Sequence, residues 1–148
     1  MTRLMRLLAL ALLWVLVLSA CGGESEAEKE KEKAKGKSAF TATCEGSALT
    51  GDVGLPSSFP KPDGVTYLKA SQAGPSNVVD GTYDGELDEA YEAYEKAVDS
   101  AGYDVLFKEK EEDDAEISYE GGGKTGQIAL RDACDNGKLA IHITNRPE

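Results

Sequence analysis

The periodicity of the apolar residues changes at Gly102, and this change limits the folds that the chain can adopt. Before Gly102, apolar side chains recur at spacings of three, four and seven residues, which places them on one side of an α-helix. These residues are Leu87, Ala90, Tyr91, Tyr94, Ala97 and Val98. We predict a helix over 86–101, with Asp84 as its amino-terminal cap and Gly102 in the left-handed position after its last turn.

After Gly102 the apolar residues alternate with polar ones, as expected for strands with one buried face. Four strands are predicted from the groups Tyr103, Val105 and Phe107; Ala115, Ile117 and Tyr119; Ile128 and Leu130; and Leu139, Ile141 and Ile143. Two further β-prone segments, 65–68 and 77–83, precede the helix. The sequence predicts a two-layer α+β fold, an antiparallel sheet of about five to six strands with one amphipathic helix packed on one face.

The first 20 residues have the organisation of a secretory signal peptide: Arg3 and Arg6, an apolar core over 7–18, and small residues before Cys21. The core is shorter than the roughly 20 residues that a membrane-spanning helix needs. Leu18-Ser19-Ala20-Cys21 resembles the lipobox of bacterial lipoproteins. The resemblance implies cleavage before Cys21, lipidation of Cys21 and a protein anchored on the extracytoplasmic face of the cell membrane. An uncleaved amino-terminal membrane helix is the alternative.

Residues 21–38 are predicted to be the lipidated cysteine and a flexible charged tether, because five Lys and five Glu occur there without a large apolar residue. Residues 39–148 then form a single domain. The whole chain has a net charge of −11, so the domain carries −13 once Arg3 and Arg6 leave with the signal peptide and the tether charges cancel. Such a domain repels nucleic acid and anionic lipid headgroups. We expect a monomer that contacts the membrane only through its anchor.

Cys44 and Cys134 are the two cysteines outside the anchor. An even pair in an exported protein indicates a disulfide. Two free thiols are the alternative, and their separation is unlike that of a redox Cys-x-x-Cys pair. We therefore predict a structural bridge between Cys44 and Cys134.

The domain sequence also resembles a group of small bacterial lipoprotein domains. That group combines a Pro-rich lead-in, two strands, a helix with a Phe-Tyr-x3-Leu-x3-Gly-Trp-x-Val-like ending, and a closing meander. The present chain has Leu55-Pro56, Phe59-Pro60, Ala93-Tyr94, Val98, Gly102-Tyr103 and Val105 at the corresponding places, with Ala93, Val98 and Tyr103 replacing Phe, Leu and Trp. The resemblance implies the fold over 55–148 and brings no activity with it.

Residues 80–91 partly match the calcium-binding loop of EF-hand proteins. Ligand positions one, three, five, seven and nine fall on Asp80, Thr82, Asp84, Glu86 and Asp88. Position twelve requires a bidentate Glu but is Tyr91, and no helix precedes the loop. We expect an acidic turn between strand and helix here rather than a metal site, and we expect no cofactor.

His142 is the single histidine, and the alternation of its strand predicts that it points away from the helix into solvent. One histidine without a free cysteine does not make a zinc site. A hydrolytic site would need Ser118 or Asp132 against the imidazole. Two other segments, 121–125 with the letters GGGKT and the acidic run 111–114, resemble a phosphate-binding loop and glycosidase carboxylates, but both are expected to be turns.

The sequence thus predicts a lipid-anchored extracytoplasmic lipoprotein whose domain is a non-catalytic binding or accessory module of the cell envelope. Its partner would be an envelope protein or a small ligand, bound on the solvent-facing side of the sheet. The alternative is a small extracytoplasmic hydrolase centred on His142.

Overall fold

The computed structural model describes residues 40–148 of the 148-residue chain. The predicted signal peptide, Cys21 and the tether lie outside the described residues. Residues 40–148 belong to one compact unit. Within the part described, no helix combines the length and the apolar character that crossing a bilayer requires.

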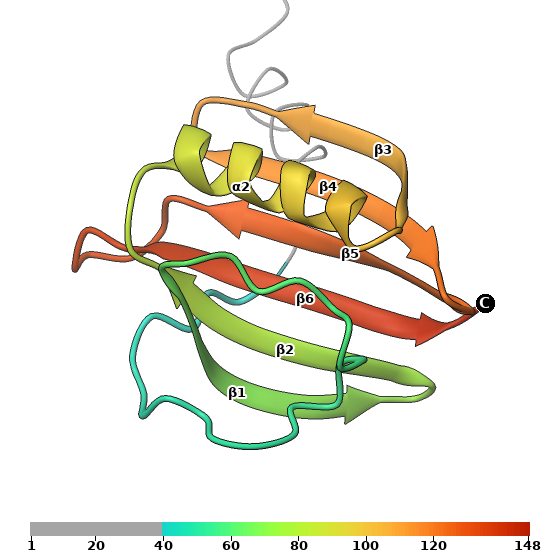
Figure 1. Ribbon diagram of the computed structural model, residues 1–148. Coiled ribbons are helices and arrows are strands. Elements are labelled where there is room, and N and C mark those ends of the chain that lie inside the picture. The colour runs from blue at the N-terminus through green and yellow to red at the C-terminus, as the bar shows by residue number, and fades with distance from the viewer. Residues whose placement is uncertain (1–39) are drawn as a thin grey trace, which may run out of the picture. The chain divides into compact units, whose positions relative to one another are not determined.

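Six strands form one antiparallel sheet, and one helix lies across it, so the predicted two-layer α+β fold is confirmed (Figure 1). The sheet order is β1-β2-β6-β5-β4-β3, so the last strand of the chain lies between the first hairpin and the meander that follows the helix. The elements are β1 (Val65–Ala73), β2 (Ser76–Tyr83), α2 (Leu87–Ser100), β3 (Asp104–Lys110), β4 (Asp114–Gly121), β5 (Lys124–Arg131) and β6 (Leu139–Pro147).

Helix α2 is one residue shorter at each end than predicted and begins without the expected cap. Its N-cap residue is Glu86, and no side chain caps it, so the prediction that Asp84 does so is wrong. Its carboxyl end is as predicted, because Gly102 has a φ of +80° and its N–H is donated to the carbonyl oxygen of Asp99. The buried side of the helix consists of Leu87, Ala90, Tyr94 and Val98.

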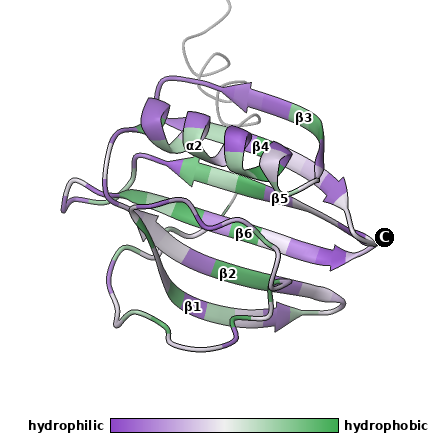
Figure 2. Cartoon of the chain, viewed as in Figure 1, coloured by the Kyte–Doolittle hydropathy of each residue, from purple (hydrophilic) through white to green (hydrophobic). Residues whose placement is uncertain are grey.

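The core lies between α2 and one face of the sheet, which receives the alternate apolar residues of β4, β5 and β6. Figure 2 shows the outward side of α2 as hydrophilic, in keeping with this packing. The lead-in contributes to the same face, because the ring of Phe59 packs 5.3 Å from that of Tyr119 and 5.9 Å from that of Tyr103. The Pro-rich segment is therefore part of the core layer rather than a linker.

Three tyrosines lie deep in this core, and burial raises their pKa values because it disfavours the charged phenolate. Burial raises the pKa of Tyr67 to about 12, against a smaller lowering by the Tyr94 hydroxyl. It also raises the pKa values of Tyr94 and Tyr119. The Tyr119 hydroxyl donates to the carbonyl oxygen of Thr144 and accepts from the amide of Asn145, which fixes β4 against β6.

Strand β3 differs from the predicted strand in the direction of one large side chain. The alternation placed Phe107 with Tyr103 and Val105 on the apolar face. A register shift between Val105 and Phe107 inserts Leu106 as an extra residue, so Phe107 pairs with Ser118 and turns to the other face. Its side chain is 51% exposed. The prediction for Phe107 is therefore wrong.

Candidate functional site

The face of the sheet that is turned away from α2, called the open face below, carries a row of mostly polar residues. Strand register aligns five positions across it, one on each of five neighbouring strands: Lys69, Asp80, His142, Ala129 and Glu116. Because directly paired residues in an antiparallel sheet project to the same side, these side chains share the open face.

At the centre of the row, the Nδ1 atom of His142 lies 2.7 Å from the Oδ1 atom of Asp80. The two side chains are 22% and 9% exposed. Because a carboxylate only accepts hydrogen bonds, the proton of this hydrogen bond belongs to Nδ1, and the Nε2 atom is left for another partner. Asp80 therefore sets both the orientation and the tautomer of the imidazole.

Phe40 covers the imidazole. Its ring is nearly parallel to that of His142, with 4.9 Å between ring centres and 12° between planes. The guanidinium carbon of Arg131 lies 4.7 Å from the centre of the Phe40 ring, and its Nη1 donates to the Phe40 carbonyl oxygen at 3.4 Å. Stacking and a cation–π contact thus hold the start of the described chain against the open face.

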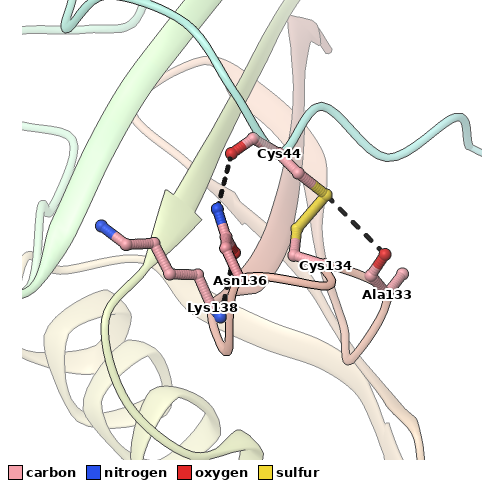
Figure 3. Close-up of a disulfide and its surroundings, with 5 residues drawn as sticks. All are labelled: Cys44, Ala133, Cys134, Asn136 and Lys138. Carbon is pink, nitrogen blue, oxygen red and sulfur yellow. Dashed lines mark hydrogen bonds between the residues drawn. A yellow bond between two sulfur atoms is a disulfide. The ribbon is translucent and has the colours of Figure 1, made fainter.

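A disulfide between Cys44 and Cys134 fixes the other end of this short segment, as predicted (Figure 3). The two Cα atoms are 5.5 Å apart. The Asn136 amide donates to the Cys44 carbonyl oxygen at 3.3 Å. The Cys44 Sγ lies 3.7 Å from the Ala133 carbonyl oxygen, but an oxidised sulfur has no proton, so this is a packing contact. Residues 40–44 are consequently tied down at both ends.

The predicted orientation of His142 is correct in one respect and wrong in another. The side chain does point away from α2, but it does not reach open solvent, because Phe40 lies over it. Sequence periodicity reports the face of a strand on which a residue lies. It does not report that a segment about 100 residues earlier folds back over that face.

Neither residue proposed as a catalytic partner contacts the imidazole. Ser118 pairs with Gln127 on β5, so it lies two strands from β6, about 10 Å at the usual strand spacing. Asp132 follows β5, and its N–H is donated to the carbonyl oxygen of Asp113. Asp80 is the partner instead, and the sequence signal that could have identified it is the pairing of β2 with β6. Within residues 40–148, no serine, threonine or cysteine side chain is hydrogen-bonded to His142.

The five metal-ligand candidates are divided between three elements. Asp80 and Thr82 belong to strand β2, Asp84 and Glu86 to the turn, and Asp88 to α2. The carboxylate of Asp80 is engaged by His142, and that of Asp88 accepts from the Lys110 ammonium at 2.7 Å. No group of three or more His, Cys, Asp or Glu side chains that could hold a metal ion occurs among residues 40–148.

The two other candidate segments form turns. Gly122 and Gly123 have φ values of +61° and +74° and connect β4 to β5, so the GGGKT letters make a hairpin turn and are followed by a strand rather than a helix. In the acidic run, the N–H of Glu111 is donated to the carbonyl oxygen of Asp114 at 2.8 Å, which closes the turn from β3 to β4. Both segments have the structure expected of them.

A hollow on the described surface lies elsewhere, between α2 and β3. It is shallow, measures about 440 Å³, and is lined by Glu92, Glu95, Lys96, Asp99, Tyr103, Asp104 and Val105. Its lining lacks a histidine, cysteine, serine or threonine. We therefore consider the open face, with its oriented imidazole, the better candidate for function.

No protein-family model matches this chain, no curated protein matches its sequence, and no solved structure matches its fold. A function for the domain must therefore be inferred from its own residues.

Proposed function

We propose that this protein is a lipid-anchored lipoprotein of the cell envelope, attached through Cys21, whose domain is a non-catalytic binding module. In this proposal the tether holds the domain away from the extracytoplasmic face of the membrane. The open face of the sheet binds an envelope protein or a small ligand. The membrane contributes attachment only, because a domain with a net charge of −13 is repelled by anionic headgroups.

The disulfide supports an extracytoplasmic location. Bridges such as Cys44–Cys134 form and persist in oxidising compartments, whereas cytosolic thiols are kept reduced. This bridge also joins segments 90 residues apart in the sequence, which is the arrangement expected of a stabilising crosslink. Together with the tetrapeptide that ends at Cys21, it favours export and anchoring over a cytosolic protein.

The covering of His142 by Phe40 is the observation that carries the choice of binding over catalysis. A hydrolytic imidazole needs a nucleophile or an activated water beside it and room for substrate above it. Here one face of the ring is stacked on Phe40 and Nδ1 is bonded to Asp80. His142 thereby helps to hold residues 40–44 on the sheet. The remaining open face, toward β4 and β3, is left for a partner.

The proposal is tested by affinity capture from envelope extract with the disulfide-intact fragment 38–148 as bait. Two matched charge reversals separate the faces: Glu120→Lys on the open face of β4, and Glu92→Lys on the exposed side of α2. We expect the wild-type and Glu92→Lys baits to capture a partner that the Glu120→Lys bait does not capture. Equal capture by all three baits, or no capture by any bait, contradicts the proposal.

A hydrolase remains the second candidate because one observation favours it. An aspartate that accepts from the Nδ1–H of a histidine is the arrangement that orients the general base in hydrolytic triads, and Asp80 and His142 have it. Hydrolysis of a chromogenic ester or amide panel by the fragment, abolished by His142→Ala and reduced by Asp80→Asn, would establish this activity. Rates equal to those without protein would eliminate it for the substrates tested.

A further inference from the structure

Strand β3 exposes two adjacent large apolar side chains. Leu106 is 55% exposed and Phe107 51%, while the next large apolar residue in the described chain, Leu49, is 38% exposed. The cause is the extra residue inserted at Leu106, which leaves Val105 packed on the core but turns Phe107 to the open face. Figure 2 shows this apolar segment in the first half of β3. Paired exposed apolar residues of this kind mark interaction surfaces more often than isolated ones.

These side chains lie on an outer strand. In the sheet of residues 40–148, β3 pairs with β4 on one side, and no strand pairs with its other side (Figure 1). An outer strand presents a row of backbone N–H and C=O groups that a further strand can pair with. At the opposite margin, the backbone of the lead-in contacts β1, because the N–H of Leu49 is donated to the carbonyl oxygen of Tyr67 at 2.8 Å. The β3 margin is thus the better acceptor.

Acidic residues flank the apolar pair on the open face. Asp104 pairs with Glu120 of β4, and Glu109 pairs with Glu116, so each end of β3 presents two carboxylates on this face. The strand's lysines do not neutralise them. Lys108 is hydrogen-bonded to Glu95 and Lys110 to Asp88, both on α2, on the other side of the sheet. Along the open face, β3 therefore presents the acidic Asp104, then the apolar pair, and then the acidic Glu109.

We propose that the outer margin of β3 binds an extended segment of a partner protein in which every second residue is, in turn, basic, apolar and basic. The segment adds to the sheet as a seventh strand. Its apolar side chain packs on Leu106 and Phe107, and its basic side chains lie near Asp104 and Glu109. This inference rests on the proposed binding function and names the part of the open face that performs it.

Charge complementarity selects this occupant over the alternatives. A second copy of the domain would bring its own carboxylates against Asp104, Glu109, Glu116 and Glu120, and the two domains carry a net charge of the same sign. Like charges facing each other across paired strands are destabilising. Anionic membranes and nucleic acids are repelled for the same reason. A basic segment gains from the same field, and its attraction should weaken as salt screens the carboxylates.

The probe is a labelled seven-residue peptide, acetyl-Thr-Lys-Thr-Leu-Thr-Lys-Thr-amide, titrated with fragment 38–148 and followed by fluorescence anisotropy and by amide NMR shifts. We expect the largest shifts over 104–110, weaker binding at high salt, and no binding of the peptide with Glu in place of Lys. Phe107→Ser and Glu109→Lys should each weaken binding by about five-fold, which corresponds to the loss of one good cross-strand contact. Glu92→Lys, an equal charge change on α2, should alter it less than two-fold.

Shifts centred on another strand, or equal binding of the acidic peptide, would overturn the inference. Concentration-dependent dimerisation of the fragment that Phe107→Ser abolishes would also overturn it, because the occupant would then be a second copy. The envelope capture separates this failure from failure of the proposed function. A partner retained by Phe107→Ser bait refutes the β3 site alone, whereas no capture by any bait refutes the binding function itself.

Discussion

Removal of the Cys44–Cys134 bridge should cost a large part of the domain's stability. The double variant Cys44→Ala, Cys134→Ala deletes a crosslink between residues 90 positions apart. In the chain-entropy account, opening a loop of this length stabilises the unfolded chain by about 4.6 kcal/mol at 25 °C, through the conformational entropy that it regains. Stabilities of 5–15 kcal/mol are typical of domains, so the variant should lie close to the folding threshold.

The native state should lose little beyond the position of residues 40–44. Strands β1 to β5 and α2 lie between the two cysteines in the sequence, β6 follows Cys134, and all of them keep their own contacts. The segment itself would retain only the Phe40 stack, the Arg131 contacts and the hydrogen bond from Asn136, all at or near the surface. We therefore expect the six strands to persist in the variant, with residues 40–44 released from the open face and His142 more exposed.

The assay is urea denaturation of fragment 38–148, monitored by far-ultraviolet circular dichroism. Tryptophan fluorescence cannot be used, because the fragment contains Phe and Tyr but no tryptophan. The free energy of unfolding should fall by about 4–5 kcal/mol in the double variant. Chemically reduced wild type should fall by a similar amount, which separates the crosslink from the side-chain change. A loss below about 1 kcal/mol in both samples would refute the reasoning, because the unfolded ensemble would then gain nothing from the opened loop.

Three further predictions concern the sheet and the core. Asp80→Ala should lower the free energy of unfolding by about 1.5–3 kcal/mol, since it removes a charge-assisted hydrogen bond to His142. Asp80→Asn should lower it less. Equal losses for the two variants in urea titrations would contradict the role given to that hydrogen bond. Stability should be fully retained below about pH 10 and fall between about pH 10 and pH 12, because unfolded tyrosines ionise before Tyr67, whose pKa burial raises to about 12. Tyr67→Phe should remove about 2–3 kcal/mol of that fall, and an unchanged pH profile would refute it. Gly126→Ala should lower the free energy of unfolding by about 3 kcal/mol or more, because its Cβ would lie 2.0 Å from the Thr144 carbonyl oxygen and 2.6 Å from the Tyr119 hydroxyl. The neighbouring variant Thr125→Ala, which loses one hydrogen bond to the Tyr119 carbonyl oxygen, should lower it by about 1 kcal/mol. Similar losses in the two variants would contradict this packing.

The elements and their order in the sequence could be predicted because local patterns determine them. The apolar spacing over 86–101 gave the helix to within one residue at each end, and Gly102 marked its end. Alternation gave the face of every apolar residue predicted to point inward on β4, β5 and β6, but it did not identify the buried Asn145. The cap assigned to Asp84 failed because three residues, with Gly85 among them, separate the end of β2 from Leu87, so the chain turns before the helix begins.

The features that shape the candidate site could not be predicted because they depend on contacts between distant segments. The pairing of β2 with β6 brings Asp80 beside His142 across 62 positions of sequence. Phe40 reaches the imidazole from a segment with no periodicity, held there by Cys44 and Arg131. The bulge at Leu106 reversed the side chain of Phe107, and strict alternation has no means of indicating an inserted residue.

The mass of the mature protein tests the export and anchoring of this domain most directly. The protein is extracted from the membranes of producing cells in detergent, and its intact mass is measured before and after reduction. We predict a chain that begins at Cys21, carries added lipid on that residue, and gains the mass of two hydrogen atoms when the added reductant opens the Cys44–Cys134 bridge. A chain that begins elsewhere, or one whose Cys21 carries no lipid, would contradict the account.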